Sequence, residues 1–120
     1  MNLFQTGNFK LASGQTSNFK IECDALTDED WKTFAFLISK KIKFSKVIGV
    51  PRGGLKLAKF LEAFEINDVT LPRLVVDDVY TTGGSIRKIM KENDIGFVIF
   101  ARNVIDDPKV KALFTVDEKT

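Results

Sequence analysis

The apolar positions of this chain change between helical and strand spacing several times, and each change predicts a boundary between elements. After Thr27, apolar residues recur three and four positions apart, which is the period of one face of a helix. Asp30 follows Thr27 at the spacing of a capping box, so Thr27 is the predicted N-cap. One apolar stripe of this helix should pack against the core: Trp31, Phe34, Ala35, Ile38 and Ile42.

Short runs rich in valine, isoleucine and phenylalanine predict buried strands in the second half of the chain. These runs cover residues 46–50, 74–76 and 97–101, and an edge strand is expected over 113–116. The first two of them lead into a turn that contains two adjacent glycines and then into a helix. The chain therefore uses a strand–glycine turn–helix unit twice.

Helical spacing predicts the two helices of these units, and a hairpin is expected near the amino terminus. The first helix should cover 55–64, and the second should carry Ile86, Ile89 and Met90 and stop at 93–96. Residues 9–11 and 19–23 read as short strands that flank a segment of turn-forming residues.

The second unit carries the strongest functional signal of the chain. Asp77 and Asp78 stand at the carboxyl end of its strand, where ionised carboxylates suit sugar hydroxyls as hydrogen-bond acceptors. Gly83 and Gly84 allow backbone conformations in which consecutive amides converge on an anion, and the next helix adds its positive end. A phosphorylated sugar is the ligand that this combination predicts. A receiver-type phosphoacceptor site and a solvated strand end are the alternatives.

The first unit has the same plan, with Pro51-Arg52-Gly53-Gly54 after its strand. A plain connecting turn accounts for the glycines in one interpretation. In the other, the backbone amides of Arg52 to Gly54 and the guanidinium of Arg52 bind a pyrophosphate, because the planar fork of arginine matches phosphate oxygens.

Composition narrows the class of protein further. The chain has 120 residues, a size typical of one domain, with 44% hydrophobic residues and a formal net charge of +2. Nothing in this charge favours nucleic acid as a partner, and no apolar run is long enough for a membrane span or a secretory signal. Cys23 has no partner for a disulfide, reads as a small buried residue, and fits a reducing cytoplasm. The absence of histidine excludes Ser-His and Cys-His catalysis.

The string DDVYTTGGS at 77–85 resembles the signature for 5-phosphoribosyl 1-pyrophosphate (PRPP) of type I phosphoribosyltransferases, and is most similar to that of orotate phosphoribosyltransferases. GVPRGGLKLA and FKLASGQTSNFKIE also resemble segments of that family, with matches at Ser13, Gly14 and Ser17. The resemblance implies an α/β domain over 1–120, with a mostly parallel twisted sheet flanked by helices in a Rossmann-like core. It also implies transfer of phosphoribose between pyrophosphate and a base.

The resemblance implies a role for each matching residue. Asp77 and Asp78 would be catalytic and hold the ribose hydroxyls, and Arg52, Gly53 and Gly54 would form the pyrophosphate loop. Thr81 and Arg102 would lie near the base, although Arg102 reads equally well as a surface residue. Mg²⁺ would arrive with PRPP, and a homodimer is expected. The loop for PRPP and its phosphate would comprise Val79, Tyr80, Thr81, Thr82, Gly83, Gly84 and Ser85.

The chain departs from the family pattern at three places. Ala12 stands where the family has a lysine, and Lys20 and Ile21 stand where it has an aromatic pair. Residues 65–72 leave no room for the family's long mobile lid loop. We therefore weigh a minimal phosphoribosyltransferase against a non-catalytic sensor module that binds PRPP or a nucleoside 5-monophosphate. A receiver-like phosphoprotein is a third, weaker hypothesis.

Overall fold

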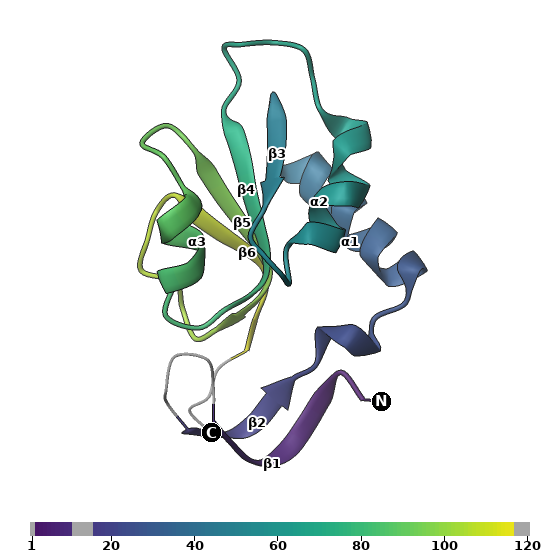
Figure 1. Ribbon diagram of the computed structural model, residues 1–120, viewed down its shortest axis with the longest axis vertical. Coiled ribbons are helices and arrows are strands. Elements are labelled where there is room, and N and C mark those ends of the chain that lie inside the picture. Colours follow the sequence, from purple (N-terminus) through teal and green to yellow (C-terminus); the bar gives the residue numbers. More distant parts are fainter. Residues whose placement is uncertain (1, 11–15, 117–120) are drawn as a thin grey trace.

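A four-stranded parallel sheet forms the centre of the protein. The computed structural model describes residues 2–10 and 16–116. The strands are β3 (Lys46–Gly49), β4 (Arg73–Tyr80), β5 (Ile95–Arg102) and β6 (Val110–Val116), and they lie side by side in chain order (Figure 1). Every neighbouring pair is parallel, which confirms the predicted mostly parallel sheet.

Helices cover both faces of this sheet. α1 (Asp28–Lys41) and α2 (Leu55–Leu61) lie on one side and α3 (Gly84–Ile89) on the other (Figure 1). Successive residues of β4 point to opposite faces, so Leu74 and Val76 belong to the core beneath α1 and α2, whereas Val75 belongs to the core beneath α3. The two-sided cover explains why the central strands read as continuous apolar runs.

The sequence prediction for α1 is confirmed in detail. Asp30 N donates to Thr27 Oγ1 at 3.2 Å and Thr27 N donates to Asp30 Oδ2 at 2.9 Å, which is a complete capping box. Within the predicted stripe, Trp31, Ala35 and Ile38 are buried and the other two members are partly buried. The helix therefore joins the core through the face that its spacing predicted.

A separate hairpin precedes this domain core. β1 (Phe4–Lys10) and β2 (Thr16–Ile21) pair antiparallel as a two-stranded sheet, and the one-turn helix η1 (Cys23–Ala25) follows. Cys23 is buried, as predicted. The predicted turn, including Ser13 and Gly14, lies outside the described residues.

One predicted boundary, the helix stop at 93–96, is wrong because of packing between α3 and β5. α3 ends at Ile89, and Gly96 lies inside β5 rather than in a helix stop. A Cβ at Gly96 would lie 2.9 Å from the sulfur of Met90, so the glycine serves close packing between helix and strand. The predicted helix over 55–64 divides into α2 and a final 3₁₀ turn, η2 (Glu62–Phe64).

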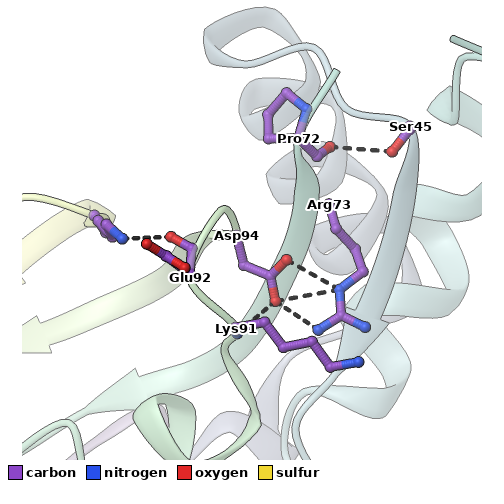
Figure 2. A network of polar contacts seen from close by, with 7 residues as sticks. Ser45, Pro72, Arg73, Lys91, Glu92 and Asp94 are labelled. Atoms are coloured by element: carbon purple, nitrogen blue, oxygen red, sulfur yellow. Dashed lines mark hydrogen bonds and ion pairs between the residues drawn. The ribbon is translucent and has the colours of Figure 1, made fainter. Parts of the chain in front are cut away.

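Side-chain hydrogen bonds and an ion pair join the segments at the amino-terminal ends of the strands. Arg73 forms a two-pronged ion pair with Asp94, with Nη2 to Oδ2 at 2.5 Å and Nε to Oδ1 at 3.1 Å (Figure 2). Asp94 also accepts the backbone N–H of Lys91 at 2.8 Å, and Ser45 donates to the carbonyl of Pro72. Every buried polar side-chain atom of the described residues has a partner.

No helix in the described part of the chain is long and apolar enough to cross a membrane.

Candidate functional site

A cavity of about 610 Å³ opens at the carboxyl ends of β4 and β5, the edge of an open α/β sheet where ligands bind. β4 contributes Asp77 to Tyr80, and the loop that follows contributes Thr81 to Ser85. The turn after β3 contributes Pro51 and Gly53, and the remaining walls come from the hairpin, α3 and the end of β5: Phe9, Lys20, Ile21, Ile86, Lys88 and Arg102. The fold thus brings most of the predicted site residues to one cavity.

Asp77 and Asp78 occupy the floor of this cavity without a cation. Asp77 is 8% exposed, and its Oδ1 accepts the N–H of Asp78 at 2.8 Å. Asp78 Oδ1 accepts the N–H of Val79 at 2.8 Å. No ion pair within residues 2–10 and 16–116 includes either carboxyl group.

The pKa of Asp77 is raised by this environment. Burial is the largest cause, and the hydrogen bond and negative charge of Asp78 add to the rise. Ionising two adjacent, largely buried carboxyl groups with no cation beside them destabilises the folded protein. A ligand that supplies hydroxyl donors or a cation would relieve this cost, so the pair suits a polyhydroxylated ligand or a metal-bound phosphate.

The loop from Thr81 to Ser85 is lined with backbone donors that have no partner. Thr81 lies next to the last paired residue of β4, but within the described residues no hydrogen bond uses the four consecutive amides of Thr82 to Ser85 as donors. Gly83 has a φ of 84°, in the left-handed region that glycine tolerates, and a Cβ there would meet the ring of Tyr80. α3 has only six residues, so the amides themselves, rather than a long helix dipole, equip this loop for an anion.

The turn after β3 differs from its prediction in one respect. Gly54 N donates to the carbonyl of Val50 at 2.8 Å, so this amide is not available to a ligand, which corrects its predicted role as a phosphate donor. A Cβ on Gly54 would meet the backbone of Val76, and one on Gly53 would meet the carboxylate of Asp78. The glycines therefore let the turn lie against the end of β4. The Pro51–Arg52 peptide is cis.

Arg52 lies beside a second, smaller cavity. This cavity measures about 370 Å³ and shares Ile21, Gly53 and Asp78 with the first. Lys56 borders it as well and pairs with Asp28 at 2.8 Å. The predicted pyrophosphate residue is thus separated from the loop at 81–85 by the carboxylate of Asp78, which borders both cavities.

Arg102 is not a surface residue, because its side chain is buried between the sheet and the hairpin. It is 4% exposed, its Nη2 donates to the carbonyl of Phe19 at 3.0 Å, and its guanidinium lies 4.2 Å from the centre of the Phe19 ring. Arg102 therefore holds β2 against the end of β5 while it borders the cavity. Lys20 and Ile21, where the family pattern has aromatic residues, border the same cavity.

Residues 65–72, which are too few for the lid loop expected from the resemblance, lie at the amino-terminal ends of the strands. Ile66 N donates to the carbonyl of Phe44 at 3.0 Å, and Ser45 N donates to the carbonyl of Pro72 at 2.9 Å. Glu65 accepts the N–H of Val47 at 2.8 Å and so covers part of the free edge of β3. Residues 62–72 are fixed at the amino-terminal ends of the strands, on the far side from the cavity.

Sequence reasoning missed two basic residues of α3. Lys88 borders the cavity, and Arg87 contacts the loop at 81–85 from outside it. Their position one turn after the glycine pair was the available signal, since basic residues beside an anion loop are expected to act on it.

The described residues contain no group of three acidic or cysteine side chains that could hold a metal ion. Asp77 and Asp78 are the two carboxylates at the cavity. One or two carboxylates together with phosphate oxygens from a substrate form the usual setting for Mg²⁺. The donor set therefore fits a magnesium ion that is held mainly by its ligand.

Comparison with known proteins supplies two sequence relatives. No family model matches the chain. The orotate phosphoribosyltransferase of Carboxydothermus hydrogenoformans is 32% identical over 139 aligned positions, covering 92% of this chain and 73% of that protein. The orotate phosphoribosyltransferase of Sulfolobus acidocaldarius is 32% identical over 118 positions, covering 75% of this chain.

The chain spans 59% of the length of the Sulfolobus relative. The 139 positions aligned with the Carboxydothermus relative exceed the 120 residues of this chain, so that relative contains residues without a counterpart here. Among solved structures, orotate phosphoribosyltransferase from Aeropyrum pernix superimposes with a TM-score of 0.66 at 24% identity, covering 94% of this chain and 88% of the other. This similarity concerns the fold.

Proposed function

This chain belongs to the orotate phosphoribosyltransferase family, and we propose that it binds PRPP and transfers its phosphoribosyl group to a nucleobase, with release of pyrophosphate. The observation that carries the proposal is that one cavity contains both hydrogen-bond donors without acceptors and carboxylates without a cation. Among the described residues, four consecutive amides (Thr82 to Ser85) have no hydrogen-bond acceptor, and two carboxylates beside them have no cation. Ribose 5-phosphate meets both needs, because its phosphate accepts hydrogen bonds and its hydroxyls donate them.

The proposed reaction is a displacement at the anomeric carbon of the ribose. The bond from the anomeric carbon to the pyrophosphate oxygen breaks, and its electron pair leaves with pyrophosphate. A ring nitrogen of the base forms the new bond to this carbon and loses its proton to solvent. Asp77 and Asp78 would hold the ribose hydroxyls, where negative charge also favours the cationic sugar of the transition state. The loop at 81–85 would bind the 5-phosphate, and the amides of Arg52 and Gly53 with the Arg52 guanidinium would bind pyrophosphate.

Positioning accounts for most of the expected rate, since the described residues at the cavity include no histidine and no obvious general base. Mg²⁺ bound to PRPP would neutralise charge on the departing pyrophosphate. Asp78, which borders both cavities, is the residue that faces both the ribose and the pyrophosphate side.

The base would lie between the sugar and the hairpin. Thr81, Arg102 and Lys20 border this part of the cavity and supply polar groups. We propose orotate or a related base as the acceptor because of the family membership, while Lys20 and Ile21 alter the wall that would face it. A homodimer and a cytoplasmic location remain predictions of the same proposal.

Pyrophosphate release is the decisive measurement. The chain is incubated with saturating PRPP and Mg²⁺ and with each common base in turn, and free pyrophosphate is followed by a coupled assay. Release that depends on one base is the expected result. PRPP binding by calorimetry without release for any base would instead identify a sensor module.

A matched pair of variants assigns the activity to the site. Asp78→Asn keeps the size of the side chain and removes its charge, and we expect PRPP to bind about tenfold more weakly, as loss of a hydrogen bond to a charged group implies. Asp68→Asn makes the same change at an exposed residue of the opposite edge and should leave PRPP binding unchanged. Equal affinities for both variants would remove Asp78 from the site.

A further inference from the structure

Arg87 makes four side-chain hydrogen bonds but does not border the cavity. Its Nη1 donates to the carbonyl of Thr82 at 3.2 Å, and its Nη2 donates to the hydroxyl of Tyr80 at 2.5 Å. Nε reaches Asp107 at 3.2 Å and Nη2 reaches Asp106 at 3.1 Å. One side chain thus joins the end of β4, the loop at 81–85 and the turn that precedes β6.

The loop depends on this residue for its hydrogen bonds. The backbone N–H of Arg87 donates to the carbonyl of Gly83 at 3.0 Å, and its guanidinium donates to the carbonyl of Thr82. Thr81 is joined to the β4–β5 ladder, but no other hydrogen bond among the described residues reaches Thr82 or Gly83. A loop whose amides have no partners has little else to hold its backbone in one conformation.

Tyr80 supplies the surface on which the loop rests. Its side chain is 5% exposed, and the backbone of Gly83 passes so near its ring that a Cβ would clash. The Arg87 guanidinium lies 5.7 Å from the centre of this ring and bonds its hydroxyl. Arg87 therefore fixes both the ring beneath the loop and the loop itself.

The charge of Arg87 is already balanced, which argues against a direct role in anion binding. Asp106 and Asp107 both contact the guanidinium, and the pKa of Asp107 is lowered first by the N–H of Lys109 and then by Arg87. The side chain thus faces two carboxylates outside the cavity rather than the space inside it.

We infer that Arg87 is a positioning residue, which holds the loop at 81–85 in its anion-binding form by joining Tyr80 and Thr82 to the turn at 106–107. This inference rests on the proposed function of the loop and deepens it. A preorganised loop binds phosphate without first losing conformational freedom. Removing the guanidinium fork should therefore weaken binding of the 5-phosphate although no ligand contact is lost.

Calorimetry with two ligands tests the inference. Ribose 5-phosphate probes the loop at 81–85, and pyrophosphate with Mg²⁺ probes the turn at 51–54. Arg87→Lys keeps the charge and loses the fork, so we expect ribose 5-phosphate to bind about tenfold more weakly, as loss of one or two hydrogen bonds implies, while pyrophosphate binds as in the wild type.

Arg73→Lys is the matched control, because Arg73 also uses its fork, but at the amino-terminal edge of the sheet. This variant should lose stability and keep both affinities. Wild-type affinity of Arg87→Lys for ribose 5-phosphate overturns the inference, and so does an equal loss for both ligands. If Arg87→Lys does not fold, Asp107→Ala decides, since it removes one anchor outside the cavity and should weaken only ribose 5-phosphate, about threefold.

The wild-type measurement separates this inference from the proposed function. A wild-type chain that binds neither ribose 5-phosphate nor PRPP overturns the proposed function and this inference with it. A wild-type chain that binds both, with unchanged binding by the variants, overturns only the role of Arg87.

Discussion

Acidic residues play opposite roles at the two ends of the parallel strands, which are called here the amino-terminal and the carboxyl-terminal edge of the sheet. At the amino-terminal edge, Asp94 is held by both prongs of Arg73 and by the N–H of Lys91 (Figure 2). At the carboxyl-terminal edge, Asp77 and Asp78 accept neighbouring amides and, among the described residues, have no cation beside them. The first edge satisfies its own charges, whereas the second leaves them for a ligand.

This difference shows which edge stabilises the fold and which one binds. Burial opposes ionisation of Asp94, but Arg73 and the Lys91 amide outweigh it, so the pKa of Asp94 is lowered. Burial and a like charge act together on Asp77, so its pKa is raised. A carboxyl group is thus stabilising as an ion at one edge and destabilising as an ion at the other.

The largest expected effect comes from removing the Arg73–Asp94 ion pair at the amino-terminal edge. Arg73→Met leaves Asp94 buried without its cation, and the free energy of unfolding should fall by about 3 kcal/mol. Urea denaturation measures this loss. Ligand affinity, measured well below the melting temperature, should not change, because the site is at the other edge. A stability loss below about 1 kcal/mol would contradict the assigned role of the pair.

The next largest effect is the loss of stability in Gly83→Ala, which is compared with alanine at the adjacent Gly84. Gly83→Ala forces a side chain into a left-handed backbone and against the Tyr80 ring, and should cost about 1–2 kcal/mol of stability together with phosphate affinity. Gly84→Ala is the matched control. Its Cβ would meet only Thr82 Oγ1, at 3.8 Å, so the free energy of unfolding should change by no more than about 0.5 kcal/mol. Equal melting temperatures for the two variants would show that the loop adopts another conformation.

The sequence predicted the features that depend on neighbours along the chain. The capping box of α1, the strand that carries Asp77 and the glycine turns all follow local rules. The family resemblance, based on DDVYTTGGS, is confirmed by the relatives. Each of these signals lies within about a dozen residues.

The remaining features depend on contacts that no local pattern records. Arg102 meets Phe19 across 83 positions of sequence, and this contact buries an arginine that read equally well as exposed. The turn at Gly54 is also tied to the next strand, because the N–H of Val50, whose carbonyl accepts the Gly54 amide, donates to the carbonyl of Val76. Arg87 gains its role only when the turn at 106–107 folds beside α3.

The smallest expected effect concerns pH. Because the folded-state pKa of Asp77 is raised, the folded protein keeps a proton that the unfolded chain releases above the ordinary carboxyl pKa of about 3.9. The folded state binds more protons in this range, so the contribution of Asp77 to stability falls as the pH rises. Asp94 has the opposite sign: its contribution is present above the unfolded pKa and is lost as the pH falls through the lowered folded value.

Asp77→Asn removes the unfavourable charge and should therefore raise the free energy of unfolding at pH 8 by about 1 kcal/mol, while it weakens binding of ribose 5-phosphate. Its advantage over the wild type should shrink as the pH is lowered toward 4, where the wild-type carboxyl is neutral in the folded state. Asp94→Asn is the control at the other edge and should lose stability at pH 7. Urea titrations at each pH give the comparison, and an Asp77→Asn variant with the wild-type pH slope would contradict the assignment of that slope to the binding edge.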